Sequence, residues 1–278
     1  MATPLPTTLT TADGLTLQVR EWPAADARAT VLIVHGLGEH AGRYGPLAAR
    51  LNAWGFAARA VDHHGHGASS GARGGLPTPA RLVDDLALVI DDTRNAFPAL
   101  PLVLLGHSLG GLVAASAVAR GRRLVDALVL SSPALDAGLS ALQKLLVATL
   151  SRLAPGLRVG NGLELDFLSH ARSVVEAYRA DPLCHERIGA RLARFLANEG
   201  AAVLAAAPAW QVPTLLLYAG DDRLVNPAGS RAFAEAAPPA FVSSLCFPAL
   251  YHEIFNERDA EPVFDALHGW LDARFPIG

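Results

Sequence analysis

The chain has 278 residues, of which 51% are hydrophobic and 18% charged, so it is neither disordered nor of low complexity and is long enough for one large α/β domain or two small ones. The net charge of −3 excludes a strongly basic nucleic-acid-binding surface, and the two cysteines, Cys184 and Cys246, form neither a disulfide framework nor a Cys-based zinc site. Chemistry on a small molecule is therefore expected, without nucleic acid as a partner.

Short runs rich in Val and Leu alternate with longer amphipathic segments, a pattern that predicts a mostly parallel sheet covered by helices. A hairpin is predicted at the start, where residues 15–22 alternate after the turn formed by residues 12–14. Buried strands are then predicted at residues 31–35, 57–62, 102–106, 127–131, 214–219 and 243–247. Helices are predicted at residues 45–54, 79–97, 110–119, 228–236 and 259–275.

The interval from Pro133 to Pro208 breaks this alternation, because it contains no convincing strand. It has helix-like segments at residues 139–153, 171–179 and 187–207, which are joined by Pro- and Gly-containing turns. We therefore predict an α/β core formed by residues 1–132 and 209–278, with residues 133–208 inserted as a helical cap.

The first cap helix is predicted to carry an apolar stripe. Its leucines are spaced by 3, 4, 4 and 3 residues, and Leu145 and Val147 widen the stripe. Packing of the stripe on the core is the first interpretation, and a surface that meets acyl chains or a membrane interface is the second. The leucines that form the stripe are Leu139, Leu142, Leu146, Leu150 and Leu153.

No membrane span or secretory signal is predicted. The most apolar long stretch, residues 139–157, is interrupted by Gln143, Lys144, Arg152 and Pro155, whereas a span needs about 18 or more apolar residues with few or no charges. The N-terminal residues lack the basic and continuous apolar regions of a signal peptide. A cytoplasmic location is therefore favoured.

A nucleophile motif lies between a predicted strand and a predicted helix. Gly106-His107-Ser108-Leu109-Gly110 matches G-x-S-x-G, with the apolar run 102–105 before it and the helix-compatible segment 111–119 after it. The glycines allow a tight turn that presents Ser108 Oγ at the end of the sheet. Ser108 is the predicted nucleophile.

A serine hydroxyl needs a base to take its proton and an acid to orient that base, and in this arrangement they follow in the order Ser, acid, His. Asp221 and Asp222 come directly after the predicted strand 214–219, and His252 comes thirty residues after Asp222. Composition does not separate the two aspartates. His252 is the predicted base, because the other histidines considered lie in the turn of the motif, in the cap or in the terminal helix; these are His107, His170, His185 and His268.

The oxyanion of a tetrahedral intermediate needs two preorganised N–H donors. One is expected from Leu109, the residue after the nucleophile, and the other from Leu37 in the Gly-rich loop 35–38 that follows an early strand. This loop is neither a G-x-G-x-x-G nor a Walker motif, so it is not expected to bind a nucleotide.

The segment 62–67 contains His63, His64 and His66, which raises the possibility of a metal site. No carboxylate or cysteine set with ligand spacing accompanies them. No metal or cofactor is therefore expected, and His66 is expected to form hydrogen bonds that brace the loop beside the site.

Several motifs together resemble one family. Residues 35–44 resemble H-G-x-G-E-H-x-x-R-Y, residues 62–71 resemble D-x-x-G-H-G-x-S-x-G, and residues 106–111 and 181–183 resemble a nucleophile turn and an Asp-Pro-Leu element. These are similar to the monoacylglycerol lipases and lysophospholipase-like proteins, also described as serine aminopeptidase-type hydrolases, of the α/β-hydrolase superfamily. The resemblance spans roughly residues 10–275.

The resemblance implies the α/β-hydrolase fold, with a mostly parallel eight-stranded sheet flanked by helices and an inserted cap that forms an acyl-chain channel. It implies Asp222, which Arg-Leu-Val follows, as the acid. It also implies Leu37 and Leu109 as the oxyanion donors. The chain departs from the family at His64, where Arg is common, and at the cap residues 169–171, so acyl and head-group preference are open.

The leading hypothesis is a metal-independent serine hydrolase for monoacylglycerols or lysophospholipids, with transient contact between the cap and a membrane interface. The same machinery also fits a short-chain carboxylesterase, a thioesterase, or an aminopeptidase related to proline iminopeptidase. The last would need anionic cap residues such as Glu164 or Asp166 near the pocket. A non-catalytic ligand-binding protein of this fold is a remote alternative, because Ser108, Asp222 and His252 are all present in order.

Overall fold

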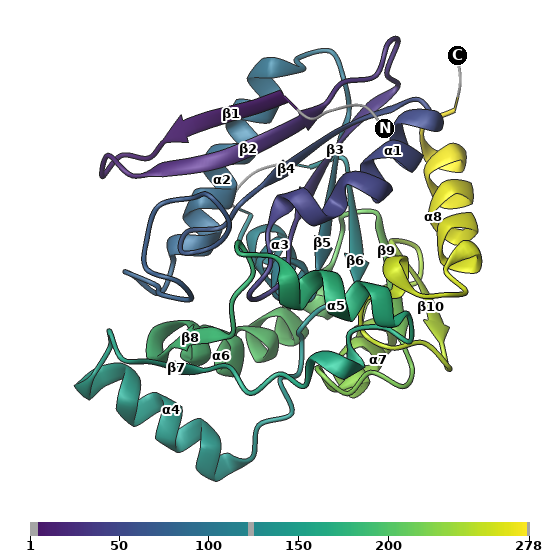
Figure 1. The fold of residues 1–278 in the computed structure, drawn as a ribbon. Helices are drawn as coiled ribbons and strands as arrows, with labels where there is room; N and C mark the ends of the chain where they lie inside the picture. Colours follow the sequence, from purple (N-terminus) through teal and green to yellow (C-terminus); the bar gives the residue numbers. More distant parts are fainter. Residues whose placement is uncertain (1–4, 122–124, 277–278) are drawn as a thin grey trace.

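The computed structural model describes residues 5–121 and 125–276, which form one central sheet with helices on both faces (Figure 1). The sheet has eight strands in the order β1-β2-β4-β3-β5-β6-β9-β10. β1 and β2 pair antiparallel, as do β2 and β4, and all the other pairs are parallel. The strands are β1 (Leu5–Thr10), β2 (Thr16–Trp22), β3 (Ala29–Val34), β4 (Phe56–Val61), β5 (Leu102–His107), β6 (Ala127–Ser131), β9 (Thr214–Ala219) and β10 (Val242–Phe247).

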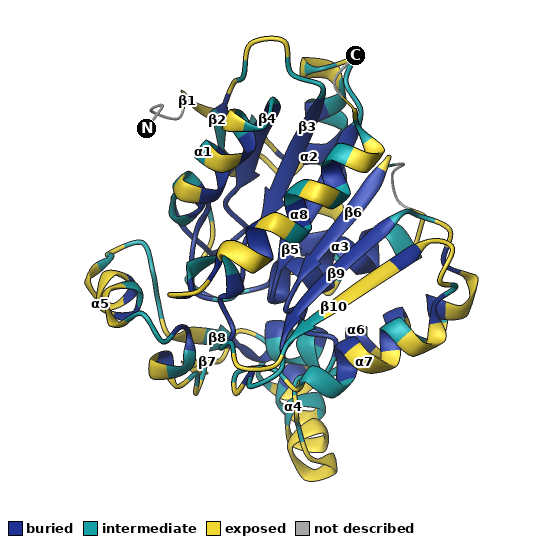
Figure 2. Cartoon of the chain, turned by 90° about the vertical axis from the view of Figure 1, so that its right-hand side faces the viewer, coloured by how far each residue is buried: buried dark blue, intermediate teal, exposed yellow. Residues whose placement is uncertain are grey.

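This sheet confirms the predicted α/β-hydrolase fold. The central strands read as continuous apolar runs because helices cover both faces, and every residue of β3, β4, β5, β6 and β9 is buried. α1 (Gly45–Ala53) and α8 (Glu261–Arg274) cover one face, in front of the sheet in Figure 2. α2 (Arg81–Ala96), α3 (Leu109–Ala119) and α7 (Pro227–Ala236) cover the other face.

The interval between β6 and β9 contains two strands that the sequence analysis missed. β7 (Arg158–Gly160) and β8 (Arg187–Gly189) pair antiparallel, so the expectation of no strand there is wrong. Each has only three residues, so neither shows an apolar run or an alternation. All three residues of β7 are exposed, whereas Ile188 of β8 is half-buried and Gly189 is buried. Residues 187–189 were also predicted to be helical, whereas α6 (Ala190–Ala206) begins after them. The other helices of the interval are α4 (Ala141–Leu153) and α5 (Arg172–Ala180).

The first cap helix does not pack its leucine stripe on the core. α4 projects from the body of the molecule (Figures 1 and 2), and Leu142 is 75% exposed, Leu146 56% and Leu153 80%. The expected packing is therefore wrong for these three leucines. Leu139 lines the large pocket described below.

α6, in contrast, packs closely on the body of the molecule. Its Leu192, Phe195 and Val203 belong to the same hydrophobic cluster as Leu112 of α3. The division of the chain into a core and a cap at residues 133 and 208 therefore stays a prediction. Within the described ranges, no helix is both long and apolar enough to cross a membrane.

Candidate active site

The turn between β5 and α3 holds Ser108 in a conformation that L-residues rarely adopt, with φ 53° and ψ −119°. The turn is tight because α3 starts against the end of β3. A Cβ atom on Gly110 would overlap the carbonyl oxygen of Val34, so no other residue fits there without a backbone shift. The G-x-S-x-G motif thus forms the predicted strand–turn–helix, and Ser108 lies in the wall of a pocket.

The structure separates the two neighbouring aspartates. Asp222 is buried, and its Oδ1 accepts hydrogen bonds from the N–H groups of Leu224 and Val225 at 2.9 and 3.0 Å. Its Oδ2 lies 2.7 Å from Nδ1 of the buried His252. The side chain of Asp221 is 45% exposed and pairs with Arg223. Only Asp222 therefore contacts the predicted base.

Asp222 and His252 shift each other's pKa, because each favours the charged form of the other. Burial opposes ionisation of Asp222, but His252 and the two backbone N–H groups lower the pKa of its carboxyl below the ordinary value. Burial would likewise lower the pKa of His252, yet the adjacent Asp222 carboxylate raises it above the ordinary value. Because the ionised carboxylate only accepts, Nδ1 of His252 carries the proton and Nε2 has a free lone pair.

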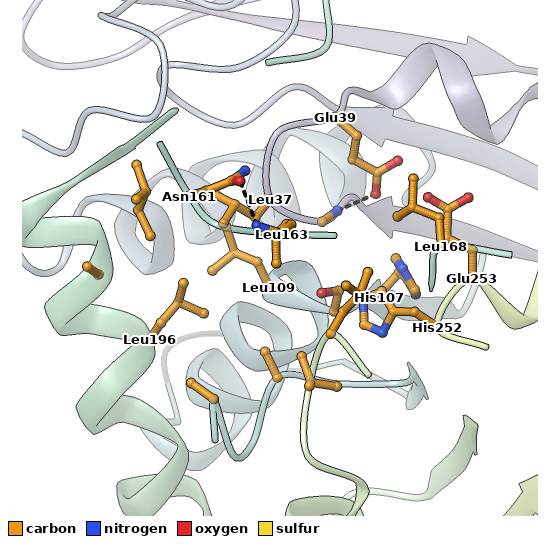
Figure 3. Close-up of a pocket in the computed structure, with 18 of the residues that line it drawn as sticks. Leu37, Glu39, His107, Leu109, Asn161, Leu163, Leu168, Leu196, His252 and Glu253 are labelled. Carbon is orange, nitrogen blue, oxygen red and sulfur yellow. Dashed lines mark hydrogen bonds between the residues drawn. The ribbon is translucent and has the colours of Figure 1, made fainter. Parts of the chain in front are cut away.

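Leu37 and Leu109, the two expected oxyanion donors, line the same pocket as Ser108 and His252 (Figure 3). Leu109 is the first residue of α3, where backbone N–H groups have no partner within the helix. Leu37 follows β3. Within the part of the chain that the structure describes, its N–H has no backbone acceptor.

His35 orients the peptide group that carries the Leu37 N–H, a role that the sequence analysis did not assign. Nε2 of His35 accepts the His63 N–H at 2.9 Å, so Nδ1 carries the proton and donates to the Gly36 carbonyl at 2.7 Å. The Gly36 carbonyl and the Leu37 N–H belong to one planar trans peptide and point in opposite directions. His35 therefore fixes the direction of that N–H from the core side.

A nearly buried ion cluster supports the same loop. Arg43 lies 2.6 Å from Glu39 and makes two bonds to Glu253, at 2.7 and 2.8 Å. Glu39 also accepts the Gly36 N–H at 2.6 Å and the Tyr44 hydroxyl at 2.7 Å. Burial opposes the charge of Glu39, but Arg43 holds its pKa well below the ordinary value. The i,i+4 spacing of Glu39 and Arg43 was the available sequence signal.

His66 makes a hydrogen bond within its own loop, since its Nδ1 lies 3.1 Å from the His64 carbonyl oxygen. Its ring also packs against His185, with 4.7 Å between the ring centres. Among the described residues, His40, Asp181 and Cys184 form a group whose ligand atoms are within reach of one ion. Nδ1 of His40 accepts the Gly42 N–H, so Nε2 carries the proton and donates to Asp181 at 2.8 Å, which occupies the nitrogen that a metal would need.

Four buried histidines predict an acid-sensitive fold. Burial lowers the pKa of His35 and His107 to about 4, and it holds those of His63 and His66 well below the ordinary value. Below pH 6.5 the unfolded chain binds protons at these residues that the folded chain does not. Each of the four should therefore reduce the free energy of unfolding as the pH falls from 6.5 toward its folded-state pKa, by at most about 1.4 kcal/mol per pH unit. His252, whose pKa is raised, acts in the opposite direction.

We expect the urea midpoint to fall between pH 7 and pH 5, with the slope m unchanged. An equal or higher midpoint at pH 5 would contradict burial of these histidines in neutral form. His35→Gln keeps a hydrogen-bonding side chain but removes the titration, so its midpoint should fall less with acid than that of the parent chain.

The pocket has a volume of about 280 Å³ and is walled mostly by apolar side chains. His107 and His252 lie side by side at one end, with 4.8 Å between their ring centres (Figure 3). The apolar wall includes residues from the segment before α4, from α4, β7, the segment after β7 and α6; these are Leu139, Val147, Val159, Leu163, Leu168, Ala193 and Leu196.

The fold and this pocket define an α/β hydrolase. A family model described as "Serine aminopeptidase, S33" matches residues 25–259, and the chain belongs to this family.

Similar proteins with known names include lipases and a phospholipase. The chain is 38% identical to a monoacylglycerol lipase of Mycolicibacterium smegmatis, with 90% of each chain covered. It is 32% identical to the phospholipase YtpA of Bacillus subtilis, over 90% of this chain and 98% of the relative. The solved structure of Paleococcus ferrophilus monoacylglycerol lipase superposes with a TM-score of 0.84 at 33% identity, covering 93% of this chain and 99% of that one.

Proposed function

We propose that this protein is a serine hydrolase of lipid carboxylic esters, with monoacylglycerols or lysophospholipids as substrates. One observation carries the proposal. Ser108 is held on a strained turn and lines an apolar pocket that His252 also lines. His252 is paired with the buried Asp222. This is the arrangement that acyl transfer requires.

In the proposed reaction, Ser108 Oγ attacks the ester carbonyl carbon while His252 Nε2 takes the hydroxyl proton. The carbonyl π electrons move to oxygen, and the N–H groups of Leu37 and Leu109 stabilise the oxyanion. His252 then gives its proton to the alcohol oxygen as the C–O bond breaks, leaving an acyl group on Ser108. Water, deprotonated by His252, then attacks the acyl carbonyl carbon. The bond to Ser108 Oγ breaks, His252 returns the proton to Oγ, and the carboxylic acid leaves. Asp222 stabilises the imidazolium in both steps.

The lipid substrate class is supported by the apolar wall of the pocket and by the lipase and phospholipase names of the relatives. The aminopeptidase alternative is weakened. Glu164 and Asp166 are exposed and do not line the pocket, and Asp166 pairs with Arg179. The short-chain esterase and thioesterase alternatives keep the same triad and differ only in substrate.

We also propose that α4 meets the lipid interface. Leu142, Leu145 and Leu153 are more than 60% exposed, whereas Leu139 and Val147 of the same segment line the pocket. Residues 139–160 contain three cations and no acidic residue, which suits contact with a lipid surface. A lipid that meets α4 therefore lies close to the pocket.

The test is a substrate series, run beside fluorophosphonate labelling with mass-spectrometric site mapping. Monoacylglycerols from acetyl to palmitoyl, a lysophospholipid, p-nitrophenyl esters, an acyl thioester and an amino-acid amide would be compared by kcat/KM. We expect label on Ser108 and kcat/KM that rises with acyl length beyond octanoyl. Label on Ser108 with turnover of short esters only would overturn the lipid assignment, and absence of labelling would favour the non-catalytic alternative.

A further inference from the structure

The segment from Tyr178 to His185 reaches the loop that carries the proposed donor Leu37. The hydroxyl of Tyr178 donates to the Gly38 carbonyl at 2.9 Å, and the backbone N–H of His185 donates to the same oxygen at 2.8 Å. A third link joins Asp181 to His40 at 2.8 Å. Three contacts thus connect this segment to residues 38–40, and we call them the loop clamp.

The loop clamp is closely fitted. Gly38 has φ 78°, and a Cβ there would overlap the His185 carbonyl oxygen and lie 2.6 Å from the Tyr178 hydroxyl oxygen. Tyr178 itself is only 3% exposed. Any other residue at position 38 would therefore push the segment and the loop apart.

The core holds the other end of the loop without help from this segment. His35 donates to the Gly36 carbonyl, and Glu39 accepts the Gly36 N–H. Across the described residues, the hydrogen bonds to the Gly38 carbonyl come only from Tyr178 and His185. The Leu37 peptide therefore lies between one anchor in the core and one in the interval between β6 and β9.

We infer that the loop clamp positions the Leu37 N–H for the oxyanion. The oxyanion hole then forms only when residues 178–185 are in contact with the loop. The inference rests on the proposed function, which makes Leu37 a donor. An N–H group stabilises a transition state only where it is already oriented. Tyr178 is on this view a positioning residue, which acts through Gly38.

Tyr178→Phe removes one hydroxyl and keeps the ring. With p-nitrophenyl butyrate we expect kcat to fall by about 10-fold with KM within twofold, a smaller loss than the roughly 10²- to 10³-fold cost of deleting an oxyanion donor. The matched control is Tyr218→Phe, since Tyr218 is buried on β9 and does not line the pocket. It should leave both constants unchanged.

Because Tyr178 also lines the pocket, a second substrate separates positioning from substrate contact. A thionoester places sulfur where the oxyanion would form and gains less from N–H donors. The ratio of ester to thionoester kcat should therefore fall several-fold in Tyr178→Phe. A loss confined to KM, or an equal loss on both substrates, would overturn the inference.

Asp181→Asn provides an independent variant, because Asp181 does not line the pocket. The amide keeps the oxygen that accepts the Leu183 N–H and weakens the link to His40. It should change kcat and the substrate ratio in the same direction as Tyr178→Phe. Hydrogen exchange of the peptide that spans residues 36–44 is then compared with and without Tyr178→Phe, in a Ser108→Ala background.

Faster exchange at residues 37–39 supports the loop clamp, and unchanged exchange contradicts it. This measurement needs no turnover. If the unmodified chain hydrolyses none of the esters, the proposed function fails, whereas the exchange comparison still decides whether residues 178–185 hold the loop.

Discussion

Ser108→Ala is expected to lower kcat/KM for ester hydrolysis by about 10³- to 10⁶-fold. Among the described residues that line the pocket, Ser108 is the one serine or threonine, and the Tyr178 hydroxyl is engaged with the Gly38 carbonyl. The variant keeps a Cβ at the strained turn, so the backbone cost and the packing are nearly unchanged. Turnover of a p-nitrophenyl ester measures activity, and fluorophosphonate labelling tests whether the nucleophile is lost. The urea midpoint shows whether the fold is unchanged.

Ser116→Ala is the matched control. Ser116 lies on α3 as a buried serine, and its hydroxyl has no hydrogen-bond partner in the described part of the chain. Its removal should leave activity within twofold and stability equal or higher. Activity of Ser108→Ala close to that of the unmodified chain would contradict the proposed mechanism outright.

The second large effect is expected at the acid. Asp222→Asn should lower kcat by roughly 10⁴-fold, because an amide at this place donates to Nδ1 of His252 and moves the proton to Nε2, where the base must be free. The geometry that makes this effect large is the 2.7 Å contact between the two side chains. Steady-state kinetics near pH 8 measure it.

Asp221→Asn is the adjacent control and should change kcat by less than twofold, since Asp221 pairs with Arg223 at the surface. The pH profile adds a second readout. Neutral His252 is the active form, so kcat/KM should rise with pH through a pKa above the ordinary histidine value of about 6.5. Comparable losses in the two variants would sink the assignment of Asp222.

Local patterns predicted the parts of the site that depend on neighbouring residues. The turn at Ser108 needs two glycines, because Gly110 lies against the end of β3 and Gly106 lies against Gly110 and Gly111. Both glycines are visible in the five consecutive residues of the motif. The choice between Asp221 and Asp222 depends on which one turns toward a histidine thirty residues away. The aspartates alone do not contain that information, and a family resemblance was needed to favour Asp222.

Other features depend on distant contacts and left no local signal. The contact between Tyr178 and Gly38 joins residues 140 positions apart, and neither has a pattern that indicates a partner. The leucines of α4 have the period of a buried face, yet Leu142 and Leu153 are exposed. Periodicity identifies an apolar face, but it does not distinguish protein from lipid as the surface that covers it.

The backbone at Ser108 has a consequence for directed evolution. A conformation of this kind costs on the order of 1–3 kcal/mol, and glycine would relieve much of that cost. A library selected only for survival on heating would thus enrich glycine at position 108 and discard the proposed nucleophile. Thermal screens of this protein therefore need a parallel assay of the proposed activity, because the residue that favours heat resistance at position 108 differs from the residue that the proposed reaction needs.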